Sequence, residues 1–458
     1  MRRGTAAAAA RTVLAVSLVL LAGNACRKPA APRAVVIVVV DALRADHLGL
    51  YGYRRPTSPQ IDRAAREARV YLRAHATSSW TLPSFGSILT GRMPSVHGAG
   101  GAIDTPLPVR RGAKAVRPLR DDIAILPALL AAHGWATGAF LNNSWLQPRL
   151  GVARGFATYD AAPATQLKNR SADDTVRAAM AWLDTVGDRP FFLFIHFFEP
   201  HVGYRPPEPL RGRFTRGIPS HLPYGAITVS SIRRRLGRLT DADRAFITAA
   251  YDEEITAVDD GIARLFQGLR ERGRWHDSLV IFTADHGEEL FDHSGFEHGH
   301  TMYEELLHVP LVVWGPGVRA GSVETPVSLA DLTPTVLEAA GFAVPKQVAG
   351  SSLWPNLHAG APVRRRALFA EGSLYGPYRR ALLLWPLKVA VTEMGPTSLF
   401  DLGADPLERH DLASTHAEQA AALAAELDRS LPRQPRADKG VQLSPESVED
   451  LRSLGYVK

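Results

Sequence analysis

Three apolar runs of strand length in this chain each end in residues that can carry chemistry. The runs are Ala34–Val40, residues 190–195 and residues 278–283. The polar residues behind them are Asp41 after the first run, His196, Glu199 and His201 after the second, and Asp285 and His286 after the third. Such runs indicate strands buried on both faces of a parallel sheet, which binds ligands beyond the carboxyl ends of its strands. The sequence therefore predicts an α/β fold with a functional site at one edge of the sheet.

Helical patterns separate these runs. In residues 241–270, apolar side chains recur at three- and four-residue steps, which predicts a long amphipathic helix; shorter helices are expected in residues 123–133 and 174–186. Alternating strands and helices favour a doubly wound sheet covered on both faces. From about residue 364, short apolar runs divided by glycine and proline predict a smaller antiparallel sheet, and an alanine-rich helix is expected in residues 416–431.

Composition excludes several classes of protein. With 458 residues, the chain suits one large α/β domain with a smaller appendage. Its composition, 46% apolar and 22% charged, argues against a disordered protein and against a multi-span membrane protein. The net charge of +7 comes from arginines scattered in loops without interleaved aromatic residues, so no nucleic-acid partner is expected. Cys26 is the single cysteine, so any metal must be bound by oxygen and imidazole ligands.

The beginning of the chain resembles an export signal. A pair of arginines precedes an apolar run, residues 13–22, that is too short for a standard transmembrane helix. Cys26 stands where a bacterial lipoprotein is cleaved and acylated, although Gly23 occupies the place of the usual leucine. We expect a signal peptide over residues 1–26, a spacer over residues 27–33, and an exported protein anchored in the cell envelope through Cys26. An ordinary secretory signal with an incidental cysteine is the alternative.

A hydroxyl and an Asp-His pair stand at positions suited to anion and metal chemistry. Residues 78–91 contain Thr81, a proline suited to a first helical turn and a closing glycine, which predicts a short helix with Thr81 at its N-terminus. Such a terminus favours a bound tetrahedral oxyanion, although a hydroxyl there is often only a cap. Asp285 and His286 are adjacent behind a strand, where both can reach one metal; a surface hydrogen bond is the alternative.

Longer motifs follow one another along almost the whole chain. They are Asp41-Ala-Leu-Arg-Ala-Asp-His-Leu-Gly-Leu-Tyr-Gly, the segment 81–91, Phe197-Phe-Glu-Pro-His201, Asp285-His-Gly-Glu-Glu, His298-Gly-His-Thr-Met-Tyr-Glu-Glu, Val309-Pro-Leu, Ser328-Leu-Ala-Asp-Leu-Thr-Pro-Thr-Val-Leu-Glu and Leu399-Phe-Asp-Leu-Gly-Ala-Asp-Pro-Leu-Glu. In this order they resemble the sulfatase family of the alkaline phosphatase superfamily. The resemblance implies a three-layer fold with a large, mainly parallel central sheet and a smaller C-terminal antiparallel sheet. It implies a catalytic domain over residues 34–362 and a C-terminal subdomain and tail over residues 363–458.

Two features depart from the sulfatase pattern. Authentic sulfatases open their central signature with a cysteine or serine that becomes formylglycine, followed four residues later by arginine, where this chain has Thr81 and Phe85. Ala42 replaces the second aspartate of the family's Asp-Asp metal pair. Threonine cannot become formylglycine. The remaining set, Asp41, Thr81, Asp285 and His286, resembles the single-metal site of phosphonate monoester hydrolases and one half of the nucleotide phosphodiesterase site.

The resemblance implies a role for each residue of the site. The implied metal ligands are Asp41, Thr81, Asp285 and His286. Thr81 is the implied nucleophile. The residues implied to contact the substrate are His201 and His298, which also suit protonation of the leaving group, and Asn143. Two carboxylates, an imidazole and an alkoxide favour Mn²⁺ or Zn²⁺, with Ca²⁺ or Mg²⁺ as alternatives. Structural roles are expected for His293, His300 and His308, and a loop or cap role for Asp46; His201 has a structural alternative too.

These features predict a metal-dependent hydrolase of sulfate- or phosphate-type esters. Phosphomonoester, phosphodiester or phosphonate substrates are favoured because Thr81 occupies the nucleophile position. The alternatives are a true sulfuric ester hydrolase, an envelope transferase of headgroups such as phosphoethanolamine, and a noncatalytic binding protein on the same fold. The expected partners are a small molecule, glycan or lipid that carries an anionic ester, and the membrane through Cys26.

Overall fold

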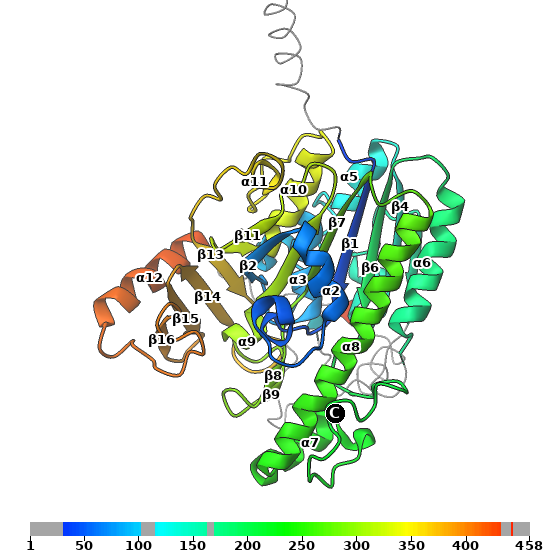
Figure 1. Ribbon diagram of the computed structural model, residues 1–458. Coiled ribbons are helices and arrows are strands. Elements are labelled where there is room, and N and C mark those ends of the chain that lie inside the picture. Colours follow the sequence, from blue (N-terminus) through cyan, green and yellow to red (C-terminus); the bar gives the residue numbers. More distant parts are fainter. Residues whose placement is uncertain (1–30, 102–114, 163–168, 432–440, 443–458) are drawn as a thin grey trace, which may run out of the picture. The chain divides into compact units, whose positions relative to one another are not determined.

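The computed structural model describes residues 31–101, 115–162, 169–431 and 441–442 (Figure 1). The expected signal peptide and Cys26 lie outside these residues, so export and lipid anchoring stay predictions. No helix in the described ranges combines the length and the apolar character that crossing a membrane requires.

A nine-stranded, mainly parallel sheet forms the centre of the fold (Figure 1). Its strand order is β11-β2-β10-β7-β1-β6-β4-β5, and β12 pairs with β2. The strands are β1 (Ala34–Val40), β2 (Arg69–His75), β4 (Ala136–Leu141), β5 (Thr158–Ala161), β6 (Phe191–Phe197), β7 (Ser278–Ala284), β10 (His308–Trp314), β11 (Gly321–Val323) and β12 (Val327–Ser328). The strands from β7 to β5 pair in parallel, whereas β10 is antiparallel to both its neighbours. The predicted α/β fold is confirmed.

The central strand β1 fixes the edge at which the site forms. All seven of its residues are alanine, valine or isoleucine and are completely buried, as expected for a strand covered on both faces. Its register with the neighbouring strands places Val40 opposite Phe197 of β6 and Ala284 of β7. Because the three strands are parallel and end together, Asp41 and Asp285 emerge side by side.

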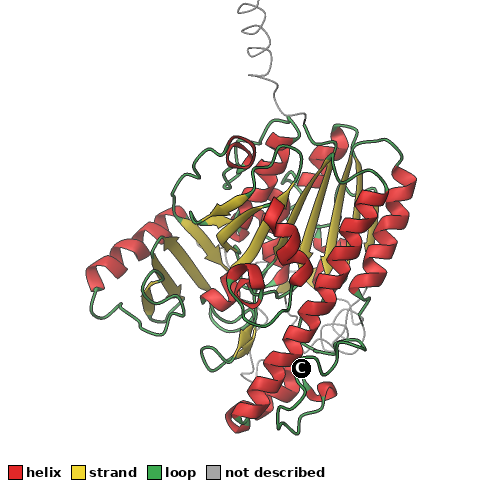
Figure 2. Cartoon of the chain, viewed as in Figure 1, coloured by secondary structure: helices red, strands yellow, loops and turns green. Residues whose placement is uncertain are grey.

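Helices cover both faces of the sheet (Figure 2). In one layer, α8 (Asp241–Glu271) contacts both α2 (Pro59–Ala64) and α6 (Ala172–Val186). In the other layer, α3 (Thr81–Thr90), α5 (Leu126–Ala132) and α10 (Leu332–Ala339) contact one another. Helix α8 begins where its periodicity predicted, because Thr240 and Asp243 form a capping box around its first turn.

A smaller antiparallel sheet follows, as predicted. It consists of β13 (Leu368–Glu371), β14 (Arg379–Leu384), β15 (Leu387–Thr392) and β16 (Thr397–Asp401) in sequential order. Helix α12 (Ala417–Ser430) packs its Leu427 against Leu382, Val389 and Leu399 of this sheet. The large sheet and the small one are joined through α11 (Trp354–Ala359), so the predicted boundary near residue 362 falls between the two kinds of sheet and stays a prediction.

Several further short elements lie between or after these. They are α4 (Pro94–His97), α7 (Val229–Arg235), α9 (Glu304–Leu307), and two small ribbons, β8 (Glu289–Leu290) with β9 (Phe296–Glu297) and β3 (Ala115–Val116) with β17 (Val441–Gln442). The first ribbon links Glu288 to His298, and this connection matters for the site below.

Candidate active site

The two carboxylates predicted from the strand ends lie beside one imidazole. Asp41 follows β1, Asp285 follows β7, and both are fully buried together with His286. The Nε2 of His286 lies 3.6 Å from Oδ1 of Asp41 and 3.4 Å from Oδ2 of Asp285. The backbone N–H of His286 also donates to Oδ1 of Asp285. The predicted Asp-His pair therefore faces inward, and the alternative of a surface hydrogen bond is wrong.

Thr81 is the first residue of α3, as the sequence predicted. Trp80 is the N-cap and no side-chain cap hydrogen bond forms at this helix start. The Thr81 hydroxyl is instead fully buried, with Oγ1 3.3 Å from Nε2 of His286. The helix terminus and its unpaired N–H groups thus meet the carboxylates behind β1 and β7, an arrangement that suits a tetrahedral anion.

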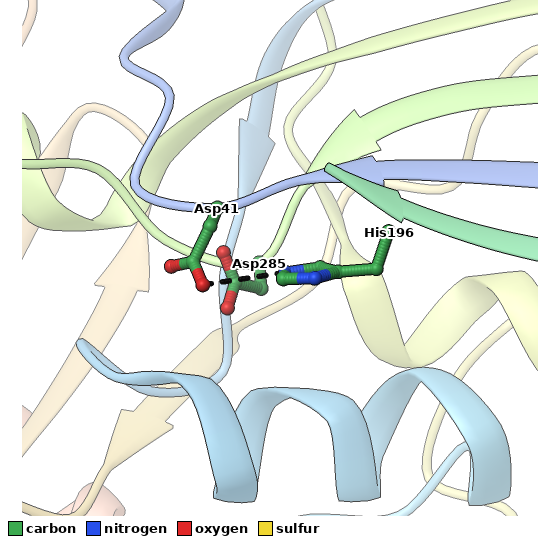
Figure 3. Close-up of side chains that lie close together, drawn as sticks. All are labelled: Asp41, His196 and Asp285. Atoms are coloured by element: carbon green, nitrogen blue, oxygen red, sulfur yellow. Dashed lines mark ion pairs between the residues drawn. The ribbon is translucent and has the colours of Figure 1, made fainter. Parts of the chain in front are cut away.

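A second imidazole enters the cluster from β6. Strand β6 extends two residues beyond the predicted end of the apolar run, so His196 lies within the strand. One ligand atom from each of Asp41, His196 and Asp285 lies within 4.8 Å of the other two, and all three side chains are buried. Figure 3 shows the two carboxyl groups and the imidazole converging on a common point, with the ion pair between His196 and Asp41 drawn as a dashed line. His196 carries no role in the set predicted from sequence.

The remaining predicted residues line the same buried region. Nδ2 of Asn143 donates a hydrogen bond of 2.5 Å to Oδ2 of Asp41. The ring of His298 lies 4.3 Å from the ring of His286 and 5.0 Å from that of His201, measured between centroids. The structure therefore brings the whole predicted set together, and the roles of its members stay predictions.

A carboxylate that the predicted set lacks holds one of these histidines. Oε1 of Glu288 lies 2.9 Å from Nδ1 of His298, and Oε2 of Glu288 accepts a hydrogen bond of 3.1 Å from the Tyr204 hydroxyl. Both Glu288 and His298 are fully buried. Glu288 stands in the quoted Asp285-His-Gly-Glu-Glu motif, but which of its two glutamates turns inward depends on the turn after β7. Sequence spacing does not determine that turn.

Burial shifts the pKa values of the site. Burial raises the pKa of Asp285, and the nearby carboxylate of Asp41 raises it further. Burial would also raise the pKa of Asp41, but three neighbouring histidines outweigh it and the pKa is lowered. Burial lowers the pKa of His201 to about 4 and that of His298 well below its ordinary value. Both imidazoles are therefore neutral near neutral pH, with one nitrogen as donor and the other as acceptor.

The residues with expected structural roles form hydrogen bonds of their own. The contacts are His293 to Glu305 (2.8 Å), His300 to Glu289 (2.6 Å), His308 to the carbonyl of Leu72 (2.8 Å), and Asp46 to Arg44 (2.8 Å). None of the four takes part in the cluster of Asp41, His196 and Asp285 that the described residues form.

The geometry agrees with the relationship that the motifs suggested. A model of the sulfatase family matches residues 33–342, more than half of the chain. The chain belongs to the sulfatase family. It is accordingly an ester-hydrolysing enzyme, and the alternative of a noncatalytic binding protein finds no support.

Two proteins and one solved structure are similar to this chain. PehA of Trinickia caryophylli, a multifunctional alkaline phosphatase superfamily protein, is 28% identical over 404 residues, which cover 72% of this chain and 77% of PehA. N-sulphoglucosamine sulphohydrolase of Homo sapiens is 29% identical over 346 residues, which cover 73% of this chain and 65% of that protein. The solved structure of phosphonate monoester hydrolase SpPMH from Silicibacter pomeroyi superposes with a TM-score of 0.70 at 22% identity, over 88% of this chain and 96% of SpPMH. The predicted fold is confirmed.

The sulfatase family implies a divalent metal, and this cluster fits one. Oδ1 of Asp41 and Oδ2 of Asp285 are buried and have no hydrogen-bond partner among the described residues. An unpaired buried carboxylate oxygen is unfavourable, whereas a divalent cation satisfies such oxygens. A donor set of two carboxylates and imidazole nitrogen suits Mn²⁺ and Zn²⁺ better than Ca²⁺, which prefers an all-oxygen shell.

Proposed function

We propose that this sulfatase-family chain hydrolyses phosphate or phosphonate esters with Thr81 as the nucleophile. The observation that carries the proposal is the position of the Thr81 hydroxyl, buried at the N-terminus of α3 and 3.3 Å from Nε2 of His286. A threonine keeps its hydroxyl and cannot supply the formylglycine of authentic sulfatases. Similarity to SpPMH, whose name states phosphonate monoester hydrolysis, supports the same substrate class.

The side chains around Thr81 suit binding of a divalent cation. Asp41, Asp285 and His286 would hold it, with Mn²⁺ or Zn²⁺ as the favoured ion. When bound, the cation supplies positive charge that lowers the pKa of the Thr81 hydroxyl and offsets the charge of the substrate oxygens. Asn143 helps to orient Asp41 by donating an amide hydrogen bond to its Oδ2.

The reaction runs in two displacements with Thr81. Oγ1 of Thr81 forms a bond to phosphorus while the P–O bond to the leaving alcohol breaks; the threonine proton passes to water. The leaving oxygen takes its proton from water, and the neutral imidazoles of His201 and His298 lie where they can orient that water. A water molecule then attacks phosphorus, releases Thr81 and yields free phosphate or phosphonate. An alcohol in place of this water would give the transfer reaction of the envelope alternative.

Sulfate ester hydrolysis is the second candidate. The relative named N-sulphoglucosamine sulphohydrolase favours it, and its name also indicates a sulfated sugar as substrate. Sulfate and phosphate esters present similar tetrahedral anions to a helix terminus and a cation. Both candidates predict a substrate with an anionic ester, carried by a small molecule, a glycan or a lipid.

Parallel assays separate the candidates. Purified protein loaded with Mn²⁺, Zn²⁺, Ca²⁺ or Mg²⁺ is tested on aryl phosphate, phosphodiester, phosphonate and sulfate esters of the same phenol. The proposal expects the phosphorus esters to react faster with Mn²⁺ or Zn²⁺, and Thr81→Ala to abolish their turnover while Thr81→Ser keeps a measurable rate. Turnover of the sulfate ester alone, or equal rates for Thr81→Ala and the wild type, would overturn it.

Export to the cell envelope is proposed with this function. Cys26 follows an apolar segment at the position of a lipoprotein cysteine. Metabolic labelling with a fatty acid tests the anchor: label is expected in the wild type and not in Cys26→Ala. Label in neither protein, with both released as soluble periplasmic or secreted protein, would support the ordinary secretory signal.

A further inference from the structure

His196 is a buried imidazole whose one close polar contact in the described residues is an ion-pair contact of Nε2 with Asp41. Its side chain is fully buried within β6, and neither Nδ1 nor Nε2 has a hydrogen-bond partner among the described residues. Leaving a buried polar group without well-formed hydrogen bonds is unfavourable, so this imidazole is expected to have a further partner. Nε2 of His196 lies 3.3 Å from Oδ2 of Asp41, an ion-pair distance.

The direction of this ring follows from the sheet. Residue 196 pairs in register with Val39, the second residue before Asp41, so its imidazole and the carboxylate of Asp41 reach the same end of adjacent parallel strands. The backbone carbonyl of His196 accepts a hydrogen bond of 2.7 Å from Nδ2 of Asn142. The ring of Phe85 contacts the imidazole edge-on, with 5.2 Å between centroids. Backbone and ring are thus both held in place.

Residue 42, which directly follows Asp41, offers no side-chain metal ligand in this chain. Ala42 stands where the family's second aspartate is expected, and its buried methyl group offers no ligand atom. The backbone of Ala42 has a left-handed conformation (φ 54°), and its N–H points to Oδ1 of Asp285 at 3.3 Å. Position 42 therefore contributes only a backbone hydrogen bond, and the ligands that join Asp41 and Asp285 must come from other elements of the site.

We propose that His196 supplies the metal ligand that Ala42 cannot, so that the cation is held by Asp41, His196, Asp285 and His286. This inference rests on the metal site of the proposed function and adds a ligand to it. One ligand atom each of Asp41, His196 and Asp285 lies within 4.8 Å of the others, and Nε2 of His286 lies within 3.6 Å of both carboxylates. Two carboxylates and two imidazoles make a site selective for Zn²⁺ over Ca²⁺.

Phe85 also departs from the sulfatase signature, and its ring contacts His196. An arginine at position 85 would place a cation against the imidazole and oppose a metal there. The uncharged ring of Phe85, packed between His196 and Phe194, keeps that contact apolar. The replacement of arginine by phenylalanine therefore suits a metal-binding His196.

The experiment measures the metal itself. Wild type, His196→Ala and the control His97→Asn are stripped of metal and titrated with Zn²⁺ in competition with a chromophoric chelator. His97 is also fully buried, but its ring contacts Ser87 and backbone atoms, so its loss leaves the metal site intact. Loss of a ligand is expected to weaken Zn²⁺ binding by at least about 100-fold in His196→Ala, more than the effect of removing a group that only supports a ligand. The control is expected to bind as the wild type does.

X-ray absorption at the zinc edge of the Zn²⁺-loaded wild type counts the imidazole ligands and tests the proposal without any variant. The proposal expects the scattering of two imidazoles; one imidazole would overturn it, whether or not His196→Ala folds. Unchanged Zn²⁺ affinity in a folded His196→Ala would overturn it as well. A wild type that binds no Mn²⁺ or Zn²⁺ would instead overturn the metal site of the proposed function, and the ligand with it.

Discussion

Nδ1 of His298 lies 2.9 Å from Oε1 of Glu288, and both side chains are fully buried. This contact sets the orientation of the His298 imidazole, whose ring centroid lies 4.3 Å from that of His286. It comes about because the ribbon of β8 and β9 turns the chain back, so that residues ten positions apart meet.

Removing the Glu288 carboxylate is expected to slow catalysis by freeing the His298 ring. Glu288→Ala should lower kcat by about 10–100-fold with a smaller effect on KM, since partners that orient a functional histidine typically contribute this much. Glu288→Gln, which keeps an acceptor for Nδ1, should recover part of the rate. Steady-state kinetics test this, and Tyr204→Phe, which removes only the hydrogen bond to the other oxygen of Glu288, is the control. Equal kcat for Glu288→Ala and the wild type would contradict the orienting role.

Chelation is expected to destabilise the protein as well as inactivate it. The unpaired oxygens of Asp41 and Asp285 lie close together in a buried site, so metal-free protein carries uncompensated repulsion. The melting temperature should fall in EDTA and rise again with Mn²⁺ or Zn²⁺ more than with Ca²⁺. Calorimetry of dialysed protein with each ion checks this. A melting temperature that responds to none of the ions contradicts the prediction.

A buried lysine is expected to tie the small sheet to the main fold. Lys388 of β15 is 1% exposed and lies 2.8 Å from Glu304 of α9 and 2.9 Å from Glu408. Lys388→Met would leave the buried carboxylate of Glu408 without its cation and Glu304 with only His75 2.9 Å away, which costs about 3–5 kcal/mol. The free energy of unfolding in urea measures this. The control is Lys346→Met at an exposed position, where a change within about 0.5 kcal/mol is expected.

Stability is expected to fall at alkaline pH partly because of His293. Burial opposes its charge, but the hydrogen bond to Glu305 prevails and raises the pKa of His293 from 6.5 to about 9. Because the folded-state pKa is the higher one, the stabilising charge is fully present below about pH 6.5 and is lost as the pH rises through about 9. The melting temperature should decline across this window, and less steeply in His293→Gln. Parallel slopes for the two proteins would show that His293 is not responsible.

Much of the fold follows from local patterns in the sequence. The β-branched run of β1 and the periodicity of α8 lie within about two residues of their predicted places, and the small antiparallel sheet follows residue 364 as its short apolar runs predicted, because each pattern is imposed by burial on one or both faces. Asp41 and Asp285 are predictable as neighbours because parallel strands end at one edge, whereas only the family resemblance implied that Thr81 joins them. Lys388 shows the limit. It lies in a predicted strand, but its burial depends on Glu304 and Glu408, whose approach is a tertiary contact.

The same limit applies inside the site. The sequence places His196 at a strand end. Its proximity to Asp41 and its contact with Phe85 follow only from the register of β6 and from tertiary packing. Glu288 and Glu289 are indistinguishable in the motif. Only the turn after β7 sends Glu288 to His298 and Glu289 to His300.

The central claim is that the Thr81 oxygen becomes bonded to phosphorus during turnover. A single-turnover reaction with enzyme in excess over an aryl phosphate ester, quenched in acid, digested and measured by mass spectrometry, tests it most directly. The account predicts a phosphorylated peptide containing Thr81 that forms and decays with product release, and no such peptide and no burst of phenol from Thr81→Ala. Phenol release by Thr81→Ala at the wild-type rate, with no phosphate on the Thr81 peptide of the wild type at any time, would contradict the account.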